Sequence, residues 1–314
     1  MIYFNYFDAS DILDKFCEHF GLDVNETKKY LLNVDFVHTS YSKMAADLKL
    51  NLLKSTNECE IYCKHLTTCS DDLESIKRYG LLRLDEVLVA DTPLKRFLAE
   101  YNIQIDPVKK EFSYKGRVLI INAPDEQCQP CIRKKPCGAY ALCDFREQMG
   151  MLHSKLYHDK GEIEFFIGGD EKTINGYQTI QEAPEILINV ARIMKCMHSK
   201  ISEYCLQNFW NRKDNWKKYL LEFYIPYEAL EMNIEIKRDS YYYDCREWLD
   251  LVGFSEDDYF DDVVPLLFYH NKHIIENCLH LFFEGEPLIK FGQLLPDYHI
   301  SFDMFSKITD KSDY

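Results

Sequence analysis

The chain has 314 residues, 46% of them hydrophobic, which is enough for one large domain or two ordinary ones around a proper core. A formal net charge of −15 repels polyanions at long range and argues mildly against a nucleic-acid partner. The sequence has no long apolar run, and its first residues lead us to expect no signal peptide, so we expect a soluble, cytoplasmic protein without membrane contact. In that compartment the twelve cysteines are expected to be thiols or metal ligands rather than disulfides.

The first part of the chain, residues 1–55, is predicted to be helical. Apolar residues recur at helical spacing over 12–20 and end at a glycine, which indicates a first helix. A second helix is expected over 26–32 with Asn25 as its cap, and a third over about 42–53. Because basic residues are sparse here, we interpret this segment as a helical lid or docking part rather than a DNA-binding helix pair.

The pattern changes at Glu60, where an alternating run rich in strand-forming residues begins. Residues 56–239 are predicted to form an α/β core with a Cys-rich insertion at 125–146, and residues 240–314 an acidic, Tyr-rich helical part. The fold class predicted is therefore α+β, with a split mixed β-sheet core between a helical N-terminal segment and a helical C-terminal part. The strands expected in the core are 60–66, a buried 117–121, 162–167 and 219–225, and the helices are 72–79 and 184–201.

Four cysteines lie within a short loop, at Cys128, Cys131, Cys137 and Cys143. The set opens with a Cys-x2-Cys step, which supplies two ligands from one turn, and zinc prefers four tetrahedral soft ligands. A structural zinc site is therefore predicted. The same kind of spacing occurs among iron–sulfur ligands, which is the less favoured metal, and the alternative to both is a set of unrelated thiols in a loop.

A strand that ends in His65 and Thr67 is followed by a helix containing Leu-Glu-Ser-Ile and closed by Gly80 and two leucines. Over residues 62–82 this pattern resembles the opening of the ADP-ribosyltransferase superfamily, whose first strand typically ends in His-x-Thr/Ser. The resemblance implies that His65 and Thr67 grip NAD, the substrate of such enzymes. It also implies a toxin or defence effector that modifies a macromolecule, nucleic acid or protein, and that has an antitoxin or other regulatory partner. The alternative for His65 is a half-buried strand histidine.

The same family carries a catalytic glutamate on a late strand of its sheet. That carboxylate holds the ribose of NAD and stabilises an oxocarbenium-like transition state. Glu222, set among apolar neighbours in the strand 219–225, is our first candidate, and Glu164, in the Glu-x-Glu pair of the strand 162–167, is its rival. For either residue the alternative is a solvated strand face. Phe166 or Tyr177 would be the aromatic residue that stacks on nicotinamide.

Two other functions remain open from the sequence. A metal-stabilised nucleic-acid-processing protein, such as a nuclease, would combine the cysteine loop with the Glu-x-Lys motif at Glu235 and Lys237. A non-enzymatic interaction module would instead use the acidic, Tyr-rich region as a docking face. His270 and His273, on a helix predicted over 263–283, are interpreted as surface histidines rather than metal ligands.

Overall fold

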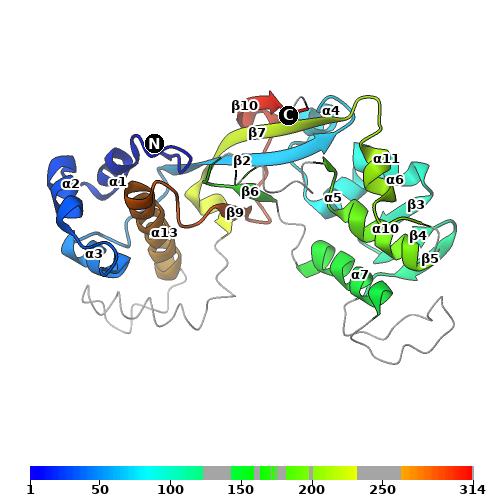
Figure 1. Ribbon diagram of the computed structural model, residues 1–314, viewed down its shortest axis with the longest axis horizontal. Helices are drawn as coiled ribbons and strands as arrows, with labels where there is room; N and C mark the ends of the chain where they lie inside the picture. The colour runs from blue at the N-terminus through cyan, green and yellow to red at the C-terminus, as the bar shows by residue number, and fades with distance from the viewer. Residues whose placement is uncertain are drawn as a thin grey trace. The chain divides into compact units, whose positions relative to one another are not determined.

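The computed structural model describes residues 1–122, 143–158, 163–170, 172, 174, 182–197, 201–231 and 263–312. It confirms the α+β class, with helices beside one mixed sheet and one small antiparallel sheet (Figure 1). Several residues singled out from the sequence lie outside the described residues, namely Cys128, Cys131, Cys137, Tyr177, Glu235 and Lys237. Among the described residues no helix combines the length and the apolarity needed to cross a membrane.

The chain divides into two compact units, and each is assembled from three separate segments of the sequence. Unit 1 comprises Met1–Lys64, Glu164–Ile174 and Glu222–Leu295. Unit 2 comprises His65–Ile163, Asn175–Leu221 and Pro296–Tyr314. Each unit therefore brings together segments that are far apart in the sequence.

The sheet of unit 1 is built around one long strand, β2. On one side of β2 lies β7, and on the other side β6, β9 and β8 follow in that order, while β1 pairs with β2 in parallel. The pairs β2–β6, β6–β9 and β9–β8 are antiparallel, so the sheet is mixed. The strands are β1 (Ile2–Phe4), β2 (Cys59–Cys69), β6 (Glu164–Phe166), β7 (Lys217–Pro226), β8 (Leu230–Glu231) and β9 (Phe291–Leu294), and a 3₁₀ turn at Tyr227–Ala229 joins β7 to β8.

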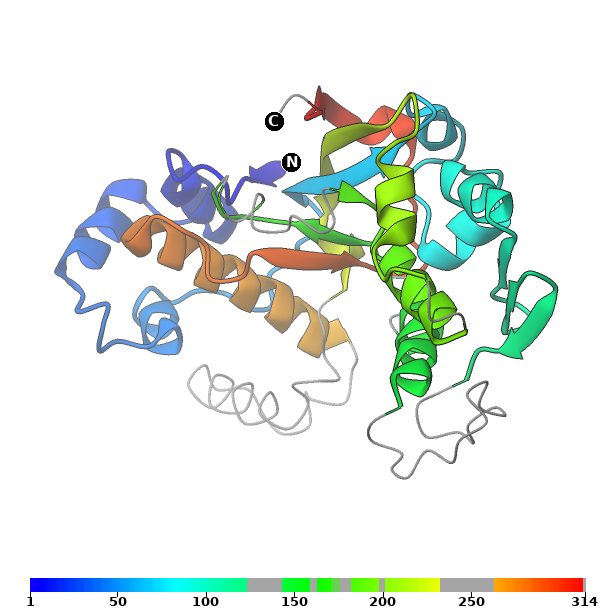
Figure 2. The same cartoon turned by 45° about the vertical axis from the view of Figure 1, so that its right-hand side comes forward.

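The helices of unit 1 within the described residues are α1 (Ile12–Phe20), α2 (Val24–Asn33), α3 (Tyr41–Asp47) and α13 (Val263–Glu284). Helices α1 and α13 pack side by side, as Figures 1 and 2 show from two directions. Both contact the start of the chain, since His19 of α1 packs against Phe4 of β1 and His273 of α13 packs against Tyr6, just after β1. The core of unit 1 thus lies between this helix pair and one face of the sheet.

The boundaries of α1 and α2 can be compared with those that the sequence predicts. The predicted helix over 12–20 is confirmed, and Gly21 ends it in the left-handed region at φ 70°. The predicted cap of the second helix is wrong, because α2 begins two residues earlier, at Val24. Its N-cap is Asp23, whose carboxylate accepts a hydrogen bond of 2.9 Å from the backbone N–H of Glu26.

Removal of this cap has a measurable consequence. The Asp23→Ala variant is expected to lose about 1 kcal/mol of unfolding free energy, because the N–H of Glu26 loses its partner at the first turn. Chemical denaturation would measure the loss. Asn25→Ala is the matched control, since Asn25 stands inside α2 rather than at its cap, and a loss as large as that of Asp23→Ala would contradict the assignment.

Unit 2 contains a three-stranded antiparallel sheet and most of the remaining helices. The strand predicted at 117–121 is present but is not buried. It forms one edge of the sheet, where Val118 and Ile120 are 54% and 48% exposed, while Leu119 and the following Ile121 face the core. The elements are α4 (Glu74–Tyr79), α5 (Leu84–Val89), α6 (Pro93–Glu100), β3 (Ile103–Asp106), β4 (Glu111–Tyr114), β5 (Arg117–Ile120), α7 (Asp144–His153), a π-helical turn (Ser154–His158), α10 (Ile186–Met197), α11 (Cys205–Trp210), a 3₁₀ turn (Phe302–Met304) and β10 (Phe305–Asp310) beside β7.

The predicted helix after β2 is confirmed as α4, and its end depends on one glycine. Gly80 caps the helix at φ 72°, a conformation that glycine adopts without steric cost. The next residue, Leu81, donates its backbone N–H to the carbonyl of Ile300 at 2.9 Å. A Cβ atom on Gly80 would lie 2.2 Å from that same carbonyl oxygen. The glycine therefore permits a close approach of two backbone segments.

Candidate functional site

The two faces of β2 differ in unit 1. Cys59, Ile61 and Cys63 are buried and alternate along the strand, so they belong to the face covered by α1 and α13. Tyr62 and Lys64 belong to the opposite face and are only partly buried. A lysine and a tyrosine on one strand face, beside buried apolar positions, make this second face the chemically richer one.

Glu222 of β7 meets this second face. Its side chain is 5% exposed, and its Oε1 accepts a hydrogen bond of 2.6 Å from the hydroxyl of Tyr62. The ammonium of Lys64 lies 3.7 Å from the same oxygen, and the Lys64 side chain is 19% exposed. A carboxylate that is removed from water needs such partners, because an uncompensated buried charge is costly. The structure thus explains how a glutamate is tolerated among apolar neighbours.

The register of β6 adds two predicted residues to the same face. Lys64 stands directly opposite Phe166, so their side chains share one side of the sheet, and Glu164, two residues away, shares it too. Phe166 is buried and packs against the ring of Phe291, with centroids 5.3 Å apart. Glu164 is exposed and accepts a hydrogen bond of 3.3 Å from the amide of Gln293. We refer to Tyr62, Lys64, Glu164, Phe166 and Glu222 as the Glu222 face.

Aromatic rings surround the Tyr62–Lys64–Glu222 contacts. The ammonium of Lys64 lies 4.2 Å from the ring centroid of Phe7, a distance at which a cation is attracted to the ring. Tyr62 packs edge-on against Phe7 at 5.8 Å and in a tilted arrangement against Tyr224 of β7 at 5.0 Å. Burial, followed by the hydrogen bond and the charge of Glu222, raises the pKa of Tyr62, so its hydroxyl remains a donor at neutral pH.

His65 and Thr67 lie on the continuation of β2, in unit 2, and both are half-buried. The contacts of Glu222 given above come from Tyr62 and Lys64 of unit 1, two residues to which the sequence assigned no role. Their alternation with the apolar residues 59, 61 and 63 was the available signal, because it assigns them to a separate face.

The predicted metal site is represented among the described residues by Cys143 alone. This cysteine is half-buried at the N-cap of α7. Within the described part of the chain, no three His, Cys, Asp or Glu side chains converge as a metal ion would require. Zinc at the cysteine loop remains a prediction from spacing. Outside that loop the buried cysteines Cys17, Cys59, Cys63, Cys69 and Cys278 are thiols rather than disulfides.

The interpretation of His270 and His273 as surface residues is wrong. Both lie on the buried side of α13, at 1% and 5% exposure. The Nδ1 of His270 is 3.0 Å from the hydroxyl of Thr56, and the Nδ1 of His273 is 3.1 Å from the hydroxyl of Tyr227. Burial lowers the pKa of His270 to about 4, which keeps its ring neutral at physiological pH. These histidines hold α13 against the rest of unit 1.

A second buried set has the connectivity of a cysteine hydrolase. The Sγ of Cys59 lies 3.3 Å from Nδ1 of His19, and Nε2 of His19 lies 2.8 Å from Oδ1 of Asn271. All three residues are at most 1% exposed. Burial raises the pKa of Cys59 to about 11 and lowers the pKa of His19, so both groups are neutral and no thiolate forms. The set ties α1, β2 and α13 together and offers no accessible nucleophile.

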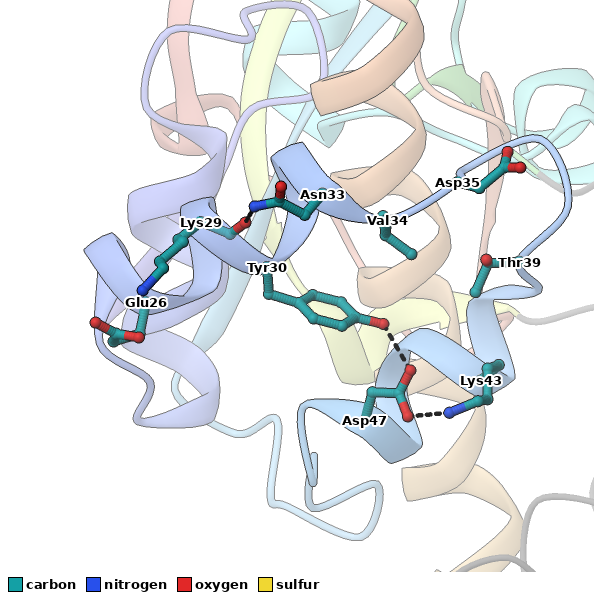
Figure 3. A pocket seen from close by; sticks show the side chains of 9 residues that line it. All are labelled: Glu26, Lys29, Tyr30, Asn33, Val34, Asp35, Thr39, Lys43 and Asp47. Carbon is teal, nitrogen blue, oxygen red and sulfur yellow. Dashed lines mark hydrogen bonds and ion pairs between the residues drawn. The ribbon is translucent and has the colours of Figure 1, made fainter.

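A surface hollow of about 570 Å³ lies between α2 and α3 (Figure 3). In it the hydroxyl of Tyr30 donates to Asp47 at 2.9 Å, and Asp47 also pairs with Lys43. Its charged groups are largely exposed and include both signs, so it has no dominant electrostatic character. The lining residues are Glu26, Lys29, Tyr30, Asn33, Val34, Asp35, Thr39, Lys43 and Asp47.

No family model matches this sequence, and no curated protein and no solved structure matches it either. The chemistry of the chain is therefore inferred from its own residues. Of the features described above, the Glu222 face alone combines a buried carboxylate with a cation, a hydroxyl donor and aromatic rings.

Proposed function

We propose that this chain transfers ADP-ribose from NAD to a macromolecule and that Glu222 is the catalytic carboxylate. The observation that carries the proposal is the burial of Glu222 between the hydroxyl of Tyr62 and the ammonium of Lys64. Cleavage of the bond between ribose and nicotinamide places positive charge on the ribose. A carboxylate that is already fixed and ionised stabilises this charge without reorganising at the moment of reaction.

The other residues of the Glu222 face fit this chemistry. Lys64 favours the ionised form of Glu222, because a nearby opposite charge stabilises a carboxylate. Phe166 supplies an aromatic surface on the same face, and the ring of Phe291, 43% exposed, extends it toward solvent. Glu164 is a second carboxylate on this face and is the one open to solvent. A flat pyridine ring beside a sugar needs both apolar and polar contacts of this kind.

The strand and helix that carry the family resemblance also support the proposal. β2 is followed by α4 and by Gly80 at its end, the order that the resemblance implies. His65 and Thr67, to which the resemblance gives the binding of NAD, continue the same strand β2. The resemblance makes a toxin or defence effector the proposed biological role, and the net charge of −15 favours a protein target over a nucleic acid.

The Glu222→Gln variant tests the proposal. Glutamine keeps an acceptor for the hydroxyl of Tyr62 but removes the charge, so NAD cleavage is expected to fall on the order of 100-fold. The measurement is release of nicotinamide and transfer of label from NAD, with purified protein alone and with cell lysate.

Two further variants serve as comparisons. Glu228→Gln changes an exposed glutamate of the neighbouring 3₁₀ turn, and it should leave the rate unchanged. Glu164→Gln distinguishes the two candidate carboxylates, since a larger loss there than at Glu222 would transfer the catalytic role. If wild-type protein leaves NAD intact under both conditions, the transferase proposal fails.

A further inference from the structure

We infer that Tyr62 is a positioning residue for Glu222: its hydroxyl fixes the orientation of the carboxylate and favours the ionised form that the reaction uses. The inference deepens the proposed function and rests on it for its catalytic consequence. The contact itself, however, is a property of the folded chain and can be measured without turnover.

The first support is the geometry of the contact. The hydroxyl of Tyr62 and Oε1 of Glu222 are 2.6 Å apart, which is the length of a hydrogen bond to an ionised acceptor. The ammonium of Lys64 is 3.7 Å from the same oxygen, too far for a good hydrogen bond but close enough for charge attraction. The two partners therefore differ in role, because Lys64 contributes an opposite charge and Tyr62 contributes a hydrogen bond that orients the carboxylate.

The second support is that the Tyr62 ring is itself held in place. Phe7 packs against it at 5.8 Å with the two ring planes 87° apart, and Tyr224 packs against it at 5.0 Å with the planes 47° apart. A phenol between two rings has few orientations open to it. Its hydroxyl is thus aimed before any substrate arrives, which is the condition for an effective positioning group.

The third support is the protonation state of the phenol. Burial and the neighbouring carboxylate raise the pKa of Tyr62, so the hydroxyl carries its proton throughout the pH range in which an enzyme works. A donor that never titrates in this range favours the ionised carboxylate at every working pH. Loss of this donor should therefore make Glu222 easier to protonate and should leave its side chain freer to rotate.

The test compares Tyr62→Phe with Tyr224→Phe. Each variant removes one hydroxyl from the same pair of packed rings, and the structure joins only that of Tyr62 to Glu222 among the hydrogen bonds described above. In Tyr62→Phe we expect kcat with NAD to fall about 10-fold to 100-fold, with KM changed less than about threefold. The acidic limb of the kcat/KM profile should also move to higher pH. In Tyr224→Phe both quantities should stay close to wild type.

A measurement without turnover separates this inference from the proposed function. Carbon NMR of protein labelled at glutamate carboxyls follows the titration of Glu222, whose signal is identified by its loss in Glu222→Gln. The signal should titrate at higher pH in Tyr62→Phe than in wild type, and at an unchanged pH in Tyr224→Phe. A merely structural hydroxyl would not move this titration, and a thermal melt would confirm that each variant is folded.

Lower kcat with a shifted carboxyl titration in Tyr62→Phe alone supports the inference. Unchanged kcat, pH profile and titration in that variant overturn it, while the transferase proposal stands. If wild type does not cleave NAD, the proposed function fails, and the titration still decides whether Tyr62 controls the ionisation of Glu222.

Discussion

The Gly80→Ala variant is expected to lose about 3 kcal/mol of unfolding free energy, because two costs act at once. Gly80 has φ 72°, where a residue with a side chain is strained by about 1 kcal/mol. Its added Cβ would also lie 2.2 Å from the carbonyl oxygen of Ile300 and 2.9 Å from the ring of His299. The backbone oxygen cannot move aside as a flexible side chain can. The two segments must separate to make room for the Cβ, so the hydrogen bond from the N–H of Leu81 to the carbonyl of Ile300 should be lost as well.

A second glycine of unit 2 provides the control. Gly116, in the turn between β4 and β5, has φ 78°, and a Cβ there would meet nothing within 4 Å. Gly116→Ala should therefore show the conformational cost alone, about 1 kcal/mol. Chemical denaturation of both variants measures the difference. Equal losses in the two variants would mean that the segments at Leu81 and Ile300 separate easily and that their close approach is not tightly held.

Acidification should destabilise the protein through His270 even while its carboxylates remain ionised. The unfolded chain binds a proton at His270 with the ordinary pKa of about 6.5, whereas burial lowers the pKa in the folded protein to about 4. The folded state thus binds fewer protons between these values. Stability is complete above about pH 6.5 and falls as the pH drops toward 4, by about 3 kcal/mol for this residue. His19, whose pKa burial also lowers, acts in the same direction.

The His270→Asn variant should flatten this pH dependence. Asparagine can still bond to the hydroxyl of Thr56, which lies 3.0 Å from Nδ1 of His270, and it does not titrate. Unfolding free energies from denaturant titrations at several pH values between 4 and 7 give the slope. His38→Asn, at a side chain that is 79% exposed, is the control and should keep the wild-type slope. A wild-type slope in His270→Asn would show that other groups cause the acid sensitivity.

The parts of the fold that the sequence predicted are those set by neighbouring residues. The helix at 12–20, the strand containing Glu222 and the helix before Gly80 each follow from apolar spacing and a terminal signal within about one turn. The cap of α2 was misplaced because Asp23 and Asn25 are both good caps. Spacing alone does not choose between two such residues.

The wrong predictions concern which faces of a strand or helix are covered by the rest of the fold. β5 contains the apolar run Val118, Leu119 and Ile120, but the strand is an edge of a small sheet and one side remains uncovered. In α13 the error was the reverse. His270 and His273 are buried because Thr56 and Tyr227, distant in the sequence, supply their partners. A periodic pattern shows that a face exists, and only the tertiary contacts show what covers it.

The sequence identified Glu222 as a candidate but did not identify the residues that contact it. Glu222 drew attention because a carboxylate among apolar strand residues requires compensation. Tyr62, whose hydroxyl donates a hydrogen bond to this carboxylate, is 160 residues away in the sequence. The two residues meet because β2 and β7 are neighbours in the sheet. Phe166 shares the face because of its register with Lys64. Pairing of distant strands cannot be read from one sequence, so these contacts became visible only in the fold.

The discontinuous assembly of unit 1 has a consequence for synthesis. His19 is synthesised before its partner Asn271, which is 252 residues further along the chain. While the ribosome is still working, α1 therefore has an apolar side without its final neighbour. Such long-range closure slows folding and exposes the nascent chain to aggregation. We expect the emerging N-terminal helices to be held by a chaperone until α13 has left the exit tunnel, and fragments that stop before α13 to be insoluble.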